Sequence, residues 1–99
     1  MEYLCEKAWN IVDFRIKISP KVIKFLDKQS KKTITRLDTA FSELQKNPYY
    51  SETLDIKKLA GCKSDYRLRI GQLRILYTIF KEDNILYVYK IAKRGDVYR

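Results

Sequence analysis

The chain has 99 residues, enough for one domain with a modest core, and its 45% hydrophobic and 33% charged residues are ordinary for a globular protein. Twenty-one Lys and Arg against twelve Asp and Glu give a net charge of +9, which favours a polyanionic partner such as nucleic acid, an acidic membrane face or an acidic protein. Since no apolar run approaches the roughly 20 residues of a membrane span and no secretory signal is evident, we expect one cytoplasmic domain over residues 1–99, with residues 1–9 as an N-terminal extension and no membrane partner.

The first predicted strand covers residues 10–18, which read NIVDFRIKI. Apolar and charged side chains alternate along this run, and a period of two is typical of a half-buried strand. One face of the strand would carry Val12, Phe14, Ile16 and Ile18.

Two helices are predicted next, and they would form a hairpin over one face of a sheet. Ser19 is suited to cap the first helix, Pro20 is suited to its first turn, and the helical spacing continues to about Gln29. Ser30 can cap the second helix, which the Asn47–Pro48 pair stops. The apolar stripe of this second helix consists of Ile34, Leu37, Phe41 and Leu44.

The second half of the chain is predicted to be a connection followed by three strands. Residues 49–63 show no period and are interpreted as the connection. Gly71–Gln72 is a two-residue hairpin signal, and KEDN at 81–84 is a second turn. The strands would cover residues 65–70, 73–80 and 85–93, the last of which is apolar on both faces and therefore suits an interior position.

The order strand, helix, helix, strand, strand, strand predicts an α+β fold. In this β-α-α-β-β-β arrangement, the helical hairpin packs on a largely antiparallel four-stranded sheet.

Positive charge is concentrated between Lys57 and Arg74, where six cations accompany the single acid Asp65, a net charge of +5. Arg67 and Arg69 share one side of their predicted strand, and the Gly71–Gln72 turn brings Arg74 alongside them. Lysines in the connection would contact phosphates, whereas most of the tyrosines would pack in the core or across strands. The predicted RNA-contacting residues are Lys57, Lys58, Lys63, Tyr66, Lys90 and Arg99.

The chain has no histidine and two cysteines, Cys5 and Cys62. Because a structural zinc site normally uses four Cys or His ligands, we expect no metal and no other cofactor. A disulfide is possible, but two free thiols suit a reducing cytoplasm better. Any acid–base chemistry must use groups other than imidazole.

The stretch LAGCKSDYRLRIGQLRILYTI resembles the central segment of the RelE/ParE superfamily of bacterial and archaeal toxins. The ending IAKRGDVYR is similar to the last strand of that superfamily, with a basic pair followed by Val-Tyr, and the resemblance covers residues 11–99. The residues that carry the central motif are Leu59, Gly61, Tyr66, Arg67, Arg69, Gly71, Arg74 and Tyr77.

The resemblance implies a toxin that cuts mRNA in the ribosomal A site, without a metal, and that an acidic antitoxin neutralises. The ribose 2′-hydroxyl would attack the adjacent phosphate and release a 5′-hydroxyl. By analogy, Arg74 would hold the scissile phosphate, Arg94 would stabilise or protonate the leaving oxygen, and Tyr98 would orient or deprotonate the ribose. Arg67 and Arg69 stand where well-studied members carry lysines, and Lys93 stands where others carry lysine or histidine.

Fixed guanidinium groups suit the extra negative charge of a pentacoordinate phosphorane. Arginine is a poor proton donor or acceptor, so Tyr98 or Lys93 would be the better proton-transfer group. Two alternatives stay open: a ParE-like inhibitor of DNA gyrase without nuclease activity, and a non-catalytic module that binds RNA or protein.

Overall fold

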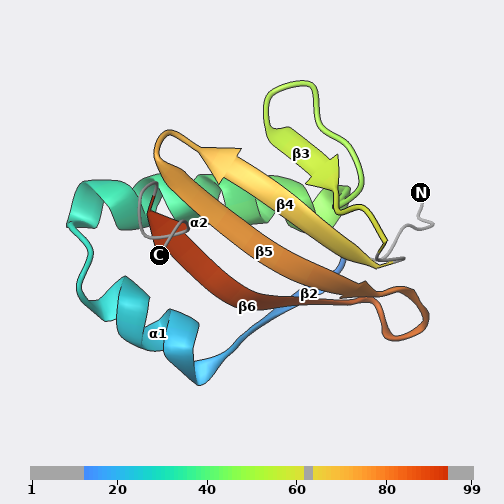
Figure 1. Ribbon diagram of the computed structural model, residues 1–99, viewed down its shortest axis with the longest axis horizontal. Coiled ribbons are helices and arrows are strands. Elements are labelled where there is room, and N and C mark those ends of the chain that lie inside the picture. Colours follow the sequence, from blue (N-terminus) through green and yellow to red (C-terminus); the bar gives the residue numbers. More distant parts are fainter. Residues whose placement is uncertain (1–12, 62–63, 94–99) are drawn as a thin grey trace, which may run out of the picture.

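The computed structural model describes residues 13–61 and 64–93 as a helical hairpin on a five-stranded sheet (Figure 1). In chain order the elements are β2 (Arg15–Ile18), α1 (Pro20–Asp27), α2 (Lys31–Lys46), β3 (Asp55–Lys58), β4 (Asp65–Ile70), β5 (Leu73–Phe80), a 3₁₀ turn (Lys81–Asp83) and β6 (Ile85–Lys93). Among these residues no helix is both long and apolar enough to cross a bilayer.

Both helices begin at the predicted serine caps. The Ser19 hydroxyl accepts a hydrogen bond from the Val22 N–H at 3.3 Å, and the Ser30 hydroxyl accepts one from the Thr33 N–H at 3.2 Å. Each bond satisfies a backbone donor that the first turn of a helix leaves without an internal partner. After α2, the Asn47 carboxamide oxygen accepts from the backbone N–H of Tyr49 at 3.0 Å, which turns the chain out of the helix.

The strands are arranged in the order β2-β6-β5-β4-β3. The β2–β6 pair is parallel and the other three pairs are antiparallel, so the predicted α+β class and the largely antiparallel sheet are confirmed. The apolar strand β6 lies inside the sheet, as predicted. The predicted number of four strands is wrong, because Asp55–Lys58 in the supposed connection forms the edge strand β3.

The hydrophobic core lies between the sheet and the helical hairpin. Figure 1 shows α2 running behind the sheet, whose other face is turned toward the viewer. Every second residue of β5 is buried on the helix side, and these residues pack with buried residues of both helices. The fully buried members of this core include Val22, Leu37, Leu44, Leu68, Ile75, Tyr77, Leu86 and Val88.

Candidate nucleic-acid interface

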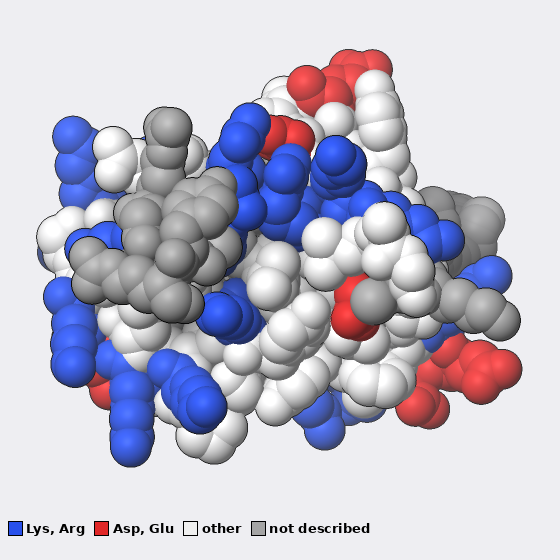
Figure 2. All heavy atoms as spheres, in the orientation of Figure 1, with Lys and Arg blue, Asp and Glu red and all other residues white. Residues whose placement is uncertain are grey.

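The face of the sheet turned away from the helices is called the open face below, and it is strongly basic. Among the described strand residues, alternation and register place seven cations and two acids on it, a net charge of +5. Figure 2 shows Lys and Arg atoms gathered over β3 and β4 on this side, with a few acidic atoms among them. The cations are Arg15, Lys17, Lys57, Arg67, Arg69, Arg74 and Lys90, and the acids are Asp55 and Asp65.

Arg69 and Arg74 are directly opposite each other across the β4–β5 ladder. The turn between them is the predicted Gly71–Gln72 pair. Gly71 has φ = +55°, a backbone conformation that residues other than glycine rarely adopt. The pair therefore concentrates positive charge at this end of the hairpin, and guanidinium groups are suited to bind a phosphate.

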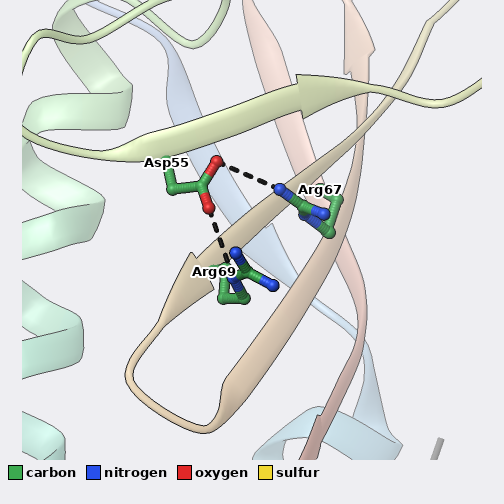
Figure 3. Close-up of polar contacts among 3 residues, drawn as sticks. All are labelled: Asp55, Arg67 and Arg69. Atoms are coloured by element: carbon green, nitrogen blue, oxygen red, sulfur yellow. Dashed lines mark hydrogen bonds and ion pairs between the residues drawn. The ribbon is translucent and has the colours of Figure 1, made fainter.

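Asp55 on β3 pairs with both arginines of β4 (Figure 3). Its Oδ1 lies 3.0 Å from Nη2 of Arg67, and its Oδ2 lies 3.2 Å from Nε of Arg69. The Arg67 side chain is only 15% exposed, whereas that of Arg69 is 50% exposed, so Arg67 is fixed in the sheet and Arg69 reaches solvent. Asp55 thus orients the two guanidinium groups and partly neutralises them.

Asp65, the second acid of the open face, accepts hydrogen bonds from neutral hydroxyl groups. Asp65 accepts a hydrogen bond from the Thr78 hydroxyl at 2.6 Å and a long one from the Tyr89 hydroxyl at 3.5 Å. Since its oxygens face these hydroxyls at the far end of β4, Asp65 does not neutralise the Arg69–Arg74 pair.

An irregularity in β6 decides which lysine joins the open face. The β5–β6 register shifts at Leu76/Tyr77, so that Leu76 pairs with Lys90 and Tyr77 pairs with Val88. The extra residue, Tyr89, bulges out of the ladder, and such bulges re-aim the side chains that follow. As a result Lys90 lies on the open face in the same cross-strand row as Arg67.

The structure brings some of the predicted site residues together and separates others. Arg67, Arg69, Arg74, Lys57 and Lys90 share the open face. In contrast, the helix side of the sheet carries Tyr66, Lys58 and Lys93, of which Lys93 pairs with the buried Leu73. The predicted residues Arg94, Tyr98, Lys63 and Arg99, like Cys5 and Cys62, lie outside the described residues.

The tyrosines on the helix side form a packed ladder. The rings of Tyr66 and Tyr77 stack with centroids 5.9 Å apart, and Tyr49 meets Tyr66 edge-on at 5.8 Å. The Tyr77 hydroxyl donates to the Pro48 carbonyl oxygen at 2.7 Å. Burial, reinforced by Tyr66, raises the pKa of Tyr77, so this phenol stays protonated at neutral pH and is not a candidate base. Its predicted packing role is confirmed.

Asp55 is the site residue that the sequence analysis missed. Its strand has four residues, and only Ile56 among them is partly buried, so the segment shows no clear alternation. One signal was present in the sequence: Asp55 and Lys57 are two residues apart, as two residues on one face of a strand must be.

The arrangement suits recognition of a phosphate chain. It offers guanidinium donors beside exposed lysines on a sheet face that neither described helix covers, and guanidinium groups match phosphate oxygens in geometry as well as charge. In residues 13–61 and 64–93, no three Cys, Asp or Glu side chains are close enough together to hold a metal ion.

This fold and this basic face define a small toxin of the RelE/ParE kind, and comparisons with known proteins agree. The model of the family described as the ParE toxin of the type II toxin–antitoxin system parDE matches residues 16–98. A protein of Methanocaldococcus jannaschii, provisionally named toxin RelE1, is 31% identical over 86 residues, which are 87% of this chain and 96% of that protein. The chain therefore belongs to the ParE toxin family of type II toxin–antitoxin systems.

Solved structures show the same fold. A chain of the RelE–RelB complex from Pyrococcus horikoshii has a TM-score of 0.75 and 29% identity, with 84% of this chain and 97% of that chain covered. For the intact RelBE toxin–antitoxin complex of E. coli the TM-score is 0.69 at 18% identity, with 83% and 98% covered. The predicted membership of the RelE/ParE superfamily is confirmed.

Proposed function

We propose that this toxin is a cytoplasmic RelE-type endoribonuclease that cleaves mRNA in the ribosomal A site and so stops translation. The observation that carries the proposal is the pair of opposed arginines, Arg69 and Arg74, on an open face with net charge +5. The pair concentrates positive charge at one end of the β4–β5 hairpin, and guanidinium donors match a scissile phosphate in charge and geometry. The RelE names of the related toxin and of the matching structures support the same activity.

In the proposed reaction the ribose 2′-oxygen attacks the neighbouring phosphorus while the bond to the 5′-oxygen breaks. The products are a 2′,3′-cyclic phosphate and a free 5′-hydroxyl, whose oxygen takes its proton from water as it leaves. Arg74 holds the phosphate and Arg94 stabilises the leaving oxygen, because the developing charge strengthens hydrogen bonds to fixed guanidinium donors. Arg67 and Arg69 add positive charge beside Arg74, and Lys57 and Lys90 hold flanking phosphates.

The proton of the attacking 2′-hydroxyl is assigned to the phenolate form of Tyr98, which neighbouring cations favour. Arginine is a poor base. Lys93 lies on the helix side of the sheet, whereas Arg74 lies on the open face. Tyr77 is also unsuitable, since its phenol is buried and bonded to the Pro48 carbonyl. Tyr98 is therefore the tyrosine that we propose to take part in the chemistry.

We further propose that an acidic antitoxin covers this surface, as RelB accompanies RelE in the complexes from Pyrococcus horikoshii and E. coli. Charge complementarity would speed the encounter and make it salt-dependent. The proposed interface includes the open face, where the antitoxin would exclude RNA by occupying the same cations.

The test is expression without an antitoxin, followed by primer extension on a translated message. We expect growth arrest and new 5′ ends inside codons, both of which Arg74→Ala, Arg94→Ala and Tyr98→Phe abolish. Intact messages during arrest, or cleavage that persists in all three variants, would sink the nuclease proposal.

The description of the matching family favours a second candidate, a ParE-like toxin that binds DNA gyrase and cuts no RNA. This candidate predicts arrest with intact messages and accumulation of broken DNA. Arrest that persists in Arg74→Ala together with inhibition of purified gyrase would decide in its favour. A non-catalytic RNA- or protein-binding module would give neither broken DNA nor broken messages.

A further inference from the structure

A second basic site lies on the helix side of the sheet, where the β4–β5 turn meets the helical hairpin. A cleft of about 340 Å³ opens there, and its volume is in the usual range for sites that hold a small ligand. Its polar lining among the described residues consists of Gln29, Thr33, Arg36, Gly71, Gln72 and Lys93, and none of the described residues that line it is acidic.

Two cations from different elements stand in this cleft. Arg36 comes from α2 and Lys93 from the end of β6, and both residues are exposed. Within the part of the chain that the structure describes, neither side chain makes an ion pair or a hydrogen bond. Two positive charges that face one cleft, with no acidic partner among the described residues, favour an anionic ligand.

Uncharged donors complete the lining. Thr33 Oγ1 accepts the hydrogen bond of the Ser30 hydroxyl at 3.1 Å, so its own proton is left to donate. Gln72 adds a side-chain amide at the turn. This mixture of a guanidinium, an ammonium, a hydroxyl and an amide matches the acceptor oxygens of a phosphodiester.

Gly71 fixes one wall of the cleft and links it to the open face. A Cβ at this position would lie 3.2 Å from Nη2 of Arg36, so the bare turn lets the guanidinium approach closely. The same short turn connects Arg69 to Arg74. A ligand held in the cleft is therefore separated from the arginine pair by the thickness of one hairpin turn.

We propose that this cleft binds a backbone phosphate of RNA flanking the scissile one, so that the strand passes around the β4–β5 turn from the open face to the helix side. This inference rests on the proposed function, and it gives Lys93 a positioning role in place of a catalytic one. Arg36 becomes an RNA-binding residue although it is far in sequence from the toxin motif.

The experiment measures equilibrium binding of a fluorescent single-stranded RNA of about twelve nucleotides, 2′-O-methylated so that it cannot be cleaved. The proteins are the full chain, Arg36→Gln, Lys93→Gln and the control Lys46→Gln, which removes one exposed charge from the other end of α2. We expect Arg36→Gln and Lys93→Gln to weaken binding about 3–10-fold, and each to reduce the slope of log K against log salt by about 0.7, the value for one single-strand phosphate. Lys46→Gln should change the dissociation constant less than about twofold.

A second arm titrates inorganic phosphate into the labelled protein and follows the Gly71 and Gln72 amide resonances. Both should shift in the full chain and remain still in Arg36→Gln. The proposal is overturned if Arg36→Gln behaves like Lys46→Gln, if phosphate moves the amides while RNA affinity is unaffected, or if Arg36→Gln weakens only an acidic antitoxin peptide. Weaker RNA binding by Arg36→Gln in a protein that cleaves nothing would uphold the cleft and reject the nuclease.

Discussion

The two faces of one sheet follow opposite rules in this protein. On the helix side, Leu68, Ile75 and Val88 are completely buried, and the polar group of Tyr77 has its hydrogen bond. On the open face, the described strands carry seven cations and two acids, and two arginines lie directly opposite each other. The first face has the features of a stable core, whereas the second places like charges close together, which is electrostatically unfavourable. Such a cost is expected where a surface is used for binding.

Substitutions of matched leucines on the two faces should show the largest difference in stability. Leu68→Ala removes a fully buried side chain and should lower the free energy of unfolding by about 2–5 kcal/mol. Leu76→Ala, on the neighbouring strand but on the open face, should cost less than about 1.5 kcal/mol, because that side chain is only partly buried. Urea denaturation measures both values, and equal losses would show that the open face is also a structural core.

Arg74→Ala should have the reverse profile, with a large effect on activity and a small one on stability. Loss of one fixed donor to a developing oxyanion typically costs a hundredfold or more in rate, or about 2.7 kcal/mol of transition-state stabilisation. The free energy of unfolding should change by less than about 1 kcal/mol, because the substitution also removes the opposition to Arg69. Single-turnover cleavage and thermal melting separate the two quantities.

Two companion variants control the Arg74 experiment. Arg74→Lys keeps the charge but loses the planar fork, so cleavage should fall less than in Arg74→Ala and still remain below that of the full chain. Lys24→Ala, on the exposed side of α1, should cleave normally. A cleavage rate in Arg74→Ala equal to that of Lys24→Ala would contradict the assigned role.

Most of the fold could be predicted because its signals are local. Serine caps marked both helices, and alternation marked β4 and β5 to within a residue. The edge strand β3 escaped because four residues with one half-buried side chain carry no period. Its pairing with β4 is a long-range event that the local sequence does not encode.

The candidate site was less predictable, and the bulge in β6 explains why. Uninterrupted alternation from Leu86 and Val88 would place Lys90 toward the helices and Lys93 with the arginines. The extra residue at Tyr89 reverses both assignments. Bulges depend on how two strands fit together, so a single strand read alone gives no sign of them.

Removal of one hydroxyl group tests how firmly the helix side depends on its hydrogen bonds. Tyr77→Phe leaves the Pro48 carbonyl without its donor and should lower the free energy of unfolding by about 1–3 kcal/mol at neutral pH. Burial raises the pKa of Tyr77, whereas an unfolded tyrosine has a pKa near 10.

The raised pKa of Tyr77 also predicts how the stability of the protein changes in alkaline solution. The unfolded phenol loses its proton above about pH 10 while the folded one keeps it, so its stabilising contribution is present below pH 10 and declines as the pH rises further. The decline for one such group is about 1.4 kcal/mol per pH unit. Denaturation between pH 9 and 11 should show a shallower loss for Tyr77→Phe than for the full chain, and parallel curves would contradict the coupling.

The smallest predicted effect concerns the balance that Asp55 imposes on the open face. Asp55→Asn releases Arg67 and Arg69, and since the Asp55 carboxylate is about half exposed, the stability lost should stay under about 1 kcal/mol. RNA binding should tighten a few-fold with a steeper salt dependence, because the freed Arg69 can contact a phosphate. Cleavage at saturating enzyme should nevertheless slow, since the two guanidinium groups lose their fixed orientation.

Glu52→Gln removes an exposed acid just before β3 and controls for net charge. If it tightens binding as much as Asp55→Asn does, charge alone explains the effect and the pairing with Asp55 does not tune the site.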